Sequence, residues 1–198
     1  MSDEKNIIDL LKKLRRGPQI IMQKDAGSII AFTGLSSGKK CLDAGAGSGF
    51  LSIMLGNIVA PSGRVTAYEI KKDFYENVKK NIKICGLDKI IKVKNNDAAK
   101  FTEKNLDLIT LDMKNAEKMV KKANRALKDG GFLVVYSPQI EQQIDVRKEM
   151  EKSGFARIRT IENIQREWSS FKGYTHPHPS GVMHTGFLTF GRKKNQGS

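Results

Sequence analysis

One glycine-rich stretch and three acidic residues beyond it carry the chemistry that the sequence offers. Residues 43–50 read Asp-Ala-Gly-Ala-Gly-Ser-Gly-Phe, with three glycines on alternate positions. Glycine lets a ligand approach the backbone closely, and the helix predicted after the turn begins with free N–H groups. The stretch therefore predicts a ligand-binding turn between a strand and a helix, although a glycine-rich turn without a ligand would have the same sequence.

The acidic residues Glu69, Asp97 and Asp112 each lie at or just beyond the end of a predicted strand. Glu69 follows the turn by about twenty residues, the interval at which a carboxylate meets the ribose hydroxyls in α/β nucleotide sites. Two hydroxyl donors can share one carboxylate. Each acid also has a plainer interpretation: Glu69 as a strand-end acid, Asp97 as a turn residue and Asp112 as a helix cap.

The elements that must position these residues alternate between strands and helices. Strands are predicted at residues 40–44, 64–69, 90–94, 106–111 and 132–136, and helices at residues 24–32, 48–57, 71–85, 116–127 and 140–152. Two further strands, 155–164 and 182–190, have only a Gly-, Pro- and His-rich loop at 169–181 between them. This order predicts an α/β fold with a mostly parallel seven-stranded sheet, helices on both faces and a C-terminal antiparallel hairpin.

Composition predicts one soluble domain, because the 198 residues are 39% hydrophobic and 28% charged. We divide the chain into an N-terminal helix and extension (1–16), the main domain (17–192) and a basic tail (193–198). Membrane-spanning runs and signal-peptide features are not seen. Cys41 and Cys85 are too few for a disulfide framework, so free thiols in the cytoplasm are expected.

The chain is strongly basic, with 35 Lys and Arg against 21 Asp and Glu and a formal charge of +14. A field of this sign favours polyanions such as nucleic acid, although a uniformly basic surface is the alternative. The basic residues of 12–16 could contact phosphates or form a solvated helix face. His176, His178 and His184 lack nearby carboxylate or thiol ligands in the sequence, so no metal site is predicted.

The residues 43–49 resemble motif I of the class I S-adenosylmethionine-dependent methyltransferases. Four other stretches narrow the resemblance to the tRNA (adenine-58, N1)-methyltransferases: residues 16–27, 111–113, 165–168 and 183–188. The match runs from Arg15 to about Lys193. It implies a Rossmann-like fold, S-adenosyl-L-methionine as cofactor, a cytoplasmic location, and tRNA or another structured RNA as partner. Because the family forms tetramers, it also suggests a homo-oligomer.

The resemblance also assigns site residues. It implies cofactor binding by Asp43, Ala44, Gly45, Gly47, Ser48, Gly49, Phe50, Glu69, Asp97, Ala98 and Asp112. Glu69 would bind the ribose and Asp97 the adenine amino group. Asp112 is also the expected catalytic residue, because a carboxylate that accepts from the amino group of the target adenine would stabilise positive charge as N1 is methylated.

Substrate binding is expected from Trp168, Tyr174 and His184. The target base would have to turn out of the folded tRNA, and aromatic side chains would hold it. Phe171 is a further candidate for this contact, whereas Tyr136 is expected to pack in the core.

Two departures from the family leave alternatives open. Members usually carry an additional N-terminal β-rich domain, where this sequence has a short helix. After Asp112 the family tends to have Pro or Glu-Pro-Trp, whereas residues 114–116 here are Lys-Asn-Ala. One alternative is a small-molecule methyltransferase, such as a precorrin type. The other is a non-catalytic RNA-binding subunit, against which the intact glycine turn and acids argue.

Overall fold

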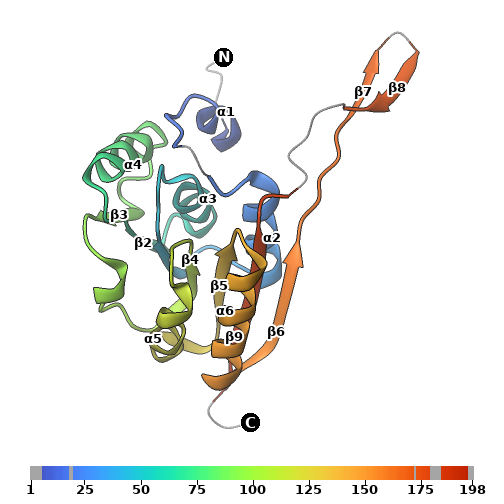
Figure 1. Cartoon of the computed structure of the whole chain (residues 1–198). Helices are drawn as coiled ribbons and strands as arrows, with labels where there is room; N and C mark the ends of the chain where they lie inside the picture. Colours follow the sequence, from blue (N-terminus) through green and yellow to red (C-terminus); the bar gives the residue numbers. More distant parts are fainter. Residues whose placement is uncertain (1–5, 18–19, 172, 179–183, 196–198) are drawn as a thin grey trace.

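The computed structural model describes residues 6–17, 20–171, 173–178 and 184–195. Its centre is a seven-stranded sheet in the order β3-β2-β1-β4-β5-β9-β6 (Figure 1). The strands are β1 (Lys40–Ala44), β2 (Arg64–Tyr68), β3 (Ile91–Lys94), β4 (Leu106–Leu111), β5 (Leu127–Ser137), β6 (Phe155–Glu162) and β9 (Phe187–Lys193). β1 to β5 are parallel to one another, and β9 runs antiparallel to both β5 and β6. The predicted α/β fold is confirmed.

Helices cover both faces of the sheet. The α-helices are α1 (Ile7–Leu11), α2 (Gln23–Thr33), α3 (Phe50–Val59), α4 (Lys72–Ile84), α5 (Val120–Ala126) and α6 (Ile140–Lys152), and two short 3-10 helices are η1 (Ala98–Lys100) and η2 (Ala116–Met119). Alternate strand residues point to opposite faces. Cys41 of β1 therefore packs in the core under α2, α3 and α4, whereas Leu42 packs in the core under α5 and α6.

The N-terminal segment packs against the main domain. Leu11 and Leu14 are buried in the same core as α3, and the side-chain amides of Asn77 and Asn81 donate to the carbonyl oxygen of Arg15. The segment before residue 17 therefore lies over α3 and α4.

Several sequence predictions need correction. The helix predicted at 116–127 is divided into η2 and α5, and β5 begins at Leu127 rather than at residue 132. The predicted loop at 169–181 contains a two-stranded antiparallel hairpin instead, formed by β7 (Trp168–Phe171) and β8 (Tyr174–Pro177). β9 begins at Phe187, so His184 precedes the strand, and it continues to Lys193, the first residue of the predicted tail.

Some predicted features lie outside the described residues, namely residues 1–5 of the N-terminal extension, residues 18 and 19 of the resemblance, residues 172 and 179–183 of the loop and last strand, and residues 196–198 of the tail. In the described part of the chain, no helix has the length and apolar character that crossing a membrane requires.

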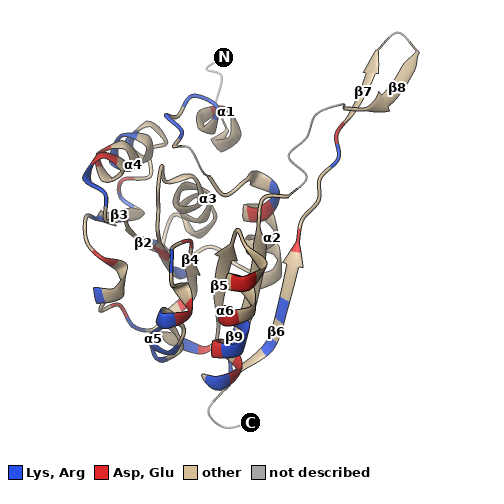
Figure 2. Cartoon of the chain, in the orientation of Figure 1, with Lys and Arg blue, Asp and Glu red and all other residues tan. Residues whose placement is uncertain are grey.

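The β7–β8 hairpin projects from the body of the molecule (Figure 1). Its two strands contain no charged residue, in contrast to the basic helices and loops around the sheet (Figure 2). The long connections between β6 and β7 and between β8 and β9 explain how β6 and β9 can pair in the sheet while the hairpin stands outside it.

Candidate functional site

The glycine turn lies at the carboxyl end of β1 and requires glycine for conformational and steric reasons. Gly45 and Gly49 have φ angles of 87° and 85°, in the left-handed region. A methyl group on Gly45 would overlap the carbonyl oxygen of Asp112. The backbone N–H of Asp112 donates to the carbonyl of Ala44 at 2.9 Å. The turn and the segment after β4 are therefore in direct backbone contact.

Asp43 anchors this turn from below. Its side chain is buried, and its two oxygens accept hydrogen bonds from Ser52 in α3 and Thr110 in β4. Burial is the main cause that raises the pKa of Asp43. Since both oxygens are already bonded within the protein, Asp43 joins three elements beneath the turn.

Glu69 is held against the turn at the end of β2. The carboxylate is buried and accepts from the backbone N–H of Gly47 at 2.9 Å and from that of Lys71 at 2.8 Å. One N–H reaches each oxygen, which leaves each with a further lone pair. The carboxylate is therefore positioned at the mouth of the turn and can still accept ligand hydroxyl groups.

A small cavity of about 30 Å³ opens at the turn. Its lining consists of residues before α2, residues of the glycine turn and Asp112: Ile20, Ile21, Asp43, Gly45, Ala46, Gly47, Ser48, Phe50, Leu51 and Asp112. The hydroxyl of Ser48 is buried there and has no hydrogen-bond partner among the described residues. Because a buried hydroxyl without a partner is costly, a polar ligand in this cavity is its natural partner.

Two other residues implied by the resemblance are packed around the same turn. Ala44 is fully buried at the end of β1. Phe50 begins α3, and the guanidinium of Arg16 lies 5.4 Å from its ring centre. The basic segment before residue 17 therefore reaches the edge of the cavity.

Asp112 is half-buried at the end of β4 and is electrostatically unusual. Burial, reinforced by the nearby carboxylates of Asp43 and Glu69, raises the pKa of Asp112 to about 7. Its carboxylate makes no hydrogen bond to another described residue. The following 3-10 helix begins after Asn115, and Asp112 does not cap it. The helix-cap interpretation therefore has no support in the geometry.

Asp97 lies at the end of β3, the next strand beyond Glu69. Its Oδ1 accepts from the backbone N–H of Ala99 at 2.8 Å and so caps η1, while Ala98 is buried. The side chain of Asn95 donates to the carbonyl of Glu69 at 2.9 Å, which ties the ends of β2 and β3 together. This geometry agrees with a turn role for Asp97, and adenine recognition remains a prediction.

Tyr136 borders the acidic site from β5. Burial, with the charges of Asp112 and Asp25, raises the pKa of Tyr136 to about 12, so its phenol is neutral. The phenol donates a hydrogen bond to the carbonyl of Thr185. Tyr136 therefore joins the site to the root of the hairpin, a role that its expected core packing did not include.

A buried polar network beside Tyr136 was not anticipated from the sequence. The carboxylate of Asp25 is fully buried and pairs with Lys24 at 3.0 Å. It also accepts from Asn163 at 2.8 Å and from Thr185 at 3.0 Å. Lys24 in turn donates to the carbonyl of Asn163 and to the hydroxyl of Thr185. The start of α2 is thereby bonded to both chain segments that lead to the hairpin. We call these four residues the Lys24 network.

His184 lies at the hairpin root and not in the glycine-turn cavity. Its Nδ1 lies 2.5 Å from Oε1 of Glu162, and its Nε2 lies 3.1 Å from the carbonyl of Pro138. The hydrogen bond to Glu162 is the main cause that raises the pKa of His184. Both ring nitrogens are therefore engaged, so a contact with substrate would use the exposed ring face.

The aromatic candidates lie on the projecting hairpin. Trp168, Phe171 and Tyr174 are 61%, 71% and 78% exposed. The guanidinium of Arg166 lies 5.8 Å from the Trp168 ring centre. The structure thus brings Asp43, the glycine turn, Glu69 and Asp112 together. Trp168 and Tyr174 belong to β7 and β8, the hairpin that projects from the body of the molecule (Figure 1). Within the described ranges, no group of His, Cys, Asp and Glu is arranged to hold a metal ion.

Comparison with known proteins agrees with this arrangement. The family described as "tRNA methyltransferase complex GCD14 subunit" matches residues 11–178. The tRNA (adenine(57)-N(1)/adenine(58)-N(1))-methyltransferase TrmI of Methanocaldococcus jannaschii is 32% identical, over 96% of this chain and 77% of its own length.

Solved structures of methyltransferases have a fold similar to that of this chain. The tRNA (m1A58) methyltransferase TrmI from Aquifex aeolicus superimposes with a TM-score of 0.86 at 26% identity, covering 94% of this chain and 75% of that one. A SAM-dependent O-methyltransferase from Thermotoga maritima gives a TM-score of 0.90 at 28% identity, covering 98% and 73%. Since the second protein is described as acting on oxygen, overall similarity does not fix the acceptor atom.

Proposed function

The chain belongs to the family of the tRNA methyltransferase complex GCD14 subunit, within the S-adenosylmethionine-dependent methyltransferases, and we propose that it methylates N1 of an adenine in the T loop of tRNA. The single observation that carries the proposal beyond the family is Asp112. Its carboxylate stands at the mouth of the cofactor turn, free of hydrogen bonds to described residues and with its pKa raised to about 7.

The residues at the turn fit S-adenosylmethionine by their chemistry. The carboxylate of Glu69 would accept from the ribose hydroxyls, and the buried hydroxyl of Ser48 would gain a polar partner. Asp97 would contact the adenine amino group, and Gly45 leaves the backbone open to the ligand. Ala44, Gly47, Gly49, Phe50 and Ala98 would shape the turn around it. Bound there, the cofactor supplies a methyl group already activated by its sulfonium.

Asp112 acts on the acceptor in this proposal. Adenine N1 is a weak nucleophile, and its methylation makes the ring cationic. A carboxylate that accepts from the exocyclic amino group raises the electron density at N1 and stabilises the new positive charge. Asp112 serves this role best when ionised. The positive charge of a bound cofactor would lower the pKa of Asp112, and the neutral phenol of Tyr136 adds no competing negative charge.

The hairpin provides the proposed RNA contact outside the cavity. Trp168 and Tyr174 offer exposed aromatic rings that could stack on bases, and His184 lies at the hairpin root. We also propose a cytoplasmic location and a homo-oligomer, the tetramer suggested by the family resemblance. Light scattering of the purified protein measures the oligomeric state.

Methyl transfer from labelled S-adenosylmethionine to an unmodified tRNA transcript tests the function. Reverse-transcriptase arrest locates the product, because an N1 methyl group blocks base pairing. We expect arrest in the T loop and a loss of about 10²–10³ in kcat for Asp112→Asn. Cofactor affinity, measured by calorimetry, separates this catalytic loss from a folding defect. Asp145→Asn, an exposed acid on α6 that lines neither cavity, is the matched control.

Three other results would each support a different function. Transfer to a different tRNA atom would keep the enzyme class and change the acceptor. Cofactor binding with transfer only to a small molecule would support the precorrin-type alternative. RNA binding without measurable cofactor binding would support a non-catalytic subunit.

A further inference from the structure

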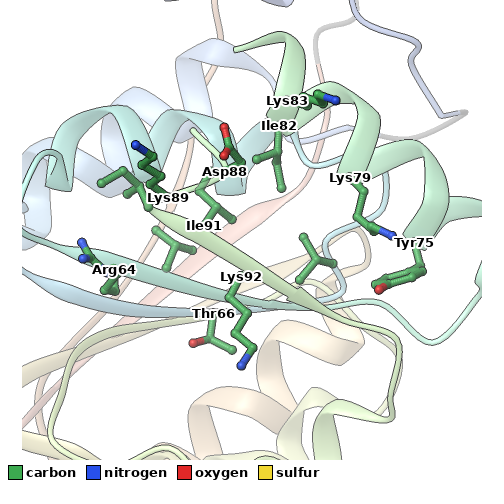
Figure 3. Close-up of a pocket in the computed structure, with 13 residues that line it drawn as sticks. Arg64, Thr66, Tyr75, Lys79, Ile82, Lys83, Asp88, Lys89, Ile91 and Lys92 are labelled. Carbon is green, nitrogen blue, oxygen red and sulfur yellow. The ribbon is translucent and has the colours of Figure 1, made fainter. Parts of the chain in front are cut away.

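A second cavity, larger than the one at the glycine turn, lies on the side of the molecule formed by α4 and the edge strand β3. It is an open groove of about 660 Å³ (Figure 3). The residues that line it come from β2, α4 and β3 with the loop before it: Arg64, Val65, Thr66, Tyr75, Lys79, Ile82, Lys83, Asp88, Lys89, Ile90, Ile91, Lys92 and Val93. We call it the α4–β3 groove.

The groove is strongly basic for its size. It is lined by five cationic side chains and one acidic side chain. Among the described residues, Lys83, Lys89 and Lys92 form no ion pair, and Lys79 has only a solvent-exposed pair with Glu76 at 3.7 Å. Figure 2 shows that α4 carries several Lys positions, with acidic positions between them. Uncompensated cations along one groove are complementary to a polyanion.

Apolar and aromatic side chains lie between the charged side chains of the groove. Ile82 of α4 and Ile91 of β3 lie between the charged side chains (Figure 3), but both are buried and belong to the core beneath the groove. Tyr75 lies at one end, with the ammonium group of Lys79 5.0 Å from its ring centre. Cations beside a partly exposed aromatic ring are features by which proteins bind single-stranded nucleic acid, with phosphates on the cations and base faces on the rings.

The groove is connected to the proposed active site through α4. The N–H of Lys71, the residue before α4, donates to the carboxylate of Glu69. Tyr75 follows one turn later, and Lys79 and Lys83 continue along the helix. The 13 residues of α4 extend about 20 Å at the rise of an α-helix. An RNA chain in the groove could therefore run toward the carboxyl edge of the sheet, where the glycine turn lies.

We propose that the α4–β3 groove binds the backbone of the RNA substrate through Lys83, Lys89 and Lys92. The proposal rests on the function above, in which that substrate is tRNA. The groove would be an RNA-binding surface of this chain that is separate from the glycine turn and from the hairpin.

The competing explanation is protection of a sheet edge, because lysines on an edge strand discourage unwanted pairing. This accounts for Lys92 of β3. It does not account for Lys83 and Lys89, which lie outside the strand, or for Arg64 of β2. Lys94, the other lysine at the end of β3, is already paired with Glu103 at 2.5 Å.

Binding of a tRNA transcript, measured by fluorescence anisotropy between 50 and 200 mM salt, tests the proposal. The variant K83Q/K89Q/K92Q is compared with K104Q/K121Q/K148Q, which removes the same charge from exposed lysines elsewhere. Loss of three phosphate contacts should weaken binding about tenfold or more at the lower salt concentrations and reduce the slope of log K against log salt by about 2. The control should change affinity less than about twofold. In turnover, KM for tRNA should rise while kcat and cofactor affinity stay unchanged.

Equal losses in the two variants would overturn the proposal in favour of a general charge effect. Unchanged binding in the groove variant would assign its lysines to edge protection and solubility. Wild-type protein that binds no tRNA would also overturn it. Since the binding assay needs no methyl transfer, a protein that binds tRNA through the groove but methylates none would contradict the proposed function and not the groove.

Discussion

The Lys24 network makes a quantitative prediction about stability. Replacing Lys24 by Met keeps a side chain of similar length but removes the ammonium group. Asp25, which is 0% exposed, would then retain only the neutral donors of Asn163 and Thr185. A buried carboxylate that loses its ionic partner is left with an uncompensated charge.

The expected loss is about 3–5 kcal/mol of the free energy of unfolding, the usual cost of removing one partner of a buried ion pair. The whole domain is expected to have only about 5–15 kcal/mol. Removing both charges in Lys24→Met/Asp25→Asn should cost less than Lys24→Met alone, since the remaining amide can still bond Asn163 or Thr185. The double variant should therefore lose much less free energy of unfolding than the sum of the two single variants, which corresponds to a large interaction energy between Lys24 and Asp25.

Urea denaturation of the wild type, both single variants and the double variant measures this cycle. Lys79→Met is the matched control, because its pair with Glu76 is about half exposed and should contribute at most about 1 kcal/mol. A loss below about 1 kcal/mol for Lys24→Met, or a double variant as unstable as the sum of the singles, would refute the reasoning.

Three further predictions concern the glycine turn and the residues around it. The folded pKa of Asp112 is about 7 against an ordinary 3.8, so the folded state binds more protons in that interval and the free energy of unfolding should fall as pH rises through it. Asp112→Asn should remove that dependence in cofactor-free protein, as measured by denaturation at pH 5 and 8. Gly45→Ala should lower cofactor affinity at least about tenfold by calorimetry, because the added methyl overlaps the Asp112 carbonyl. Ser52→Ala should cost about 1–3 kcal/mol in denaturation, because it removes a donor from the buried Asp43.

Each of these has an outcome that contradicts it. An identical pH dependence in wild type and Asp112→Asn would assign the titration to other groups. Gly45→Ala should be compared with Gly27→Ala in α2, where nothing lies within 4 Å of the added methyl, and equal cofactor affinity in the two would contradict the close contact. A neutral Ser52→Ala would mean that Asp43 finds another donor.

The sequence predicted the order of strands and helices in the seven-stranded sheet, and it predicted that the acids lie at the ends of strands. Strand and helix periods alternate along the chain, and parallel strands place their carboxyl ends at one edge. Glu69 and Asp112 were therefore predictable neighbours of the glycine turn. The bonds that complete the turn, between Glu69 and the Gly47 backbone and between Asp112 and Ala44, follow from the same local order.

The remaining features depend on contacts that no local pattern encodes. Asp25 lies in the first turn of α2, but its partner Thr185 is 160 residues away in the sequence. The hairpin was predicted as a loop because its Gly, Pro and His content is typical of turns, and its strands have few residues in a core. β5 extends back to Leu127 because pairing with β4 overrides the helix-ending Gly130 and Gly131.

The place of β9 in the sheet has a consequence for how the chain folds. Among the described residues, β6 pairs with β9 alone, and β9 follows the other six strands of the sheet in the sequence. During synthesis β6 therefore has no partner until residues 187–193 have left the ribosome, although the parallel strands from β1 to β5 can already associate. A chain that stops before Phe187 loses two strands from the sheet and not one. Its β5 edge would be left open to pairing with other chains.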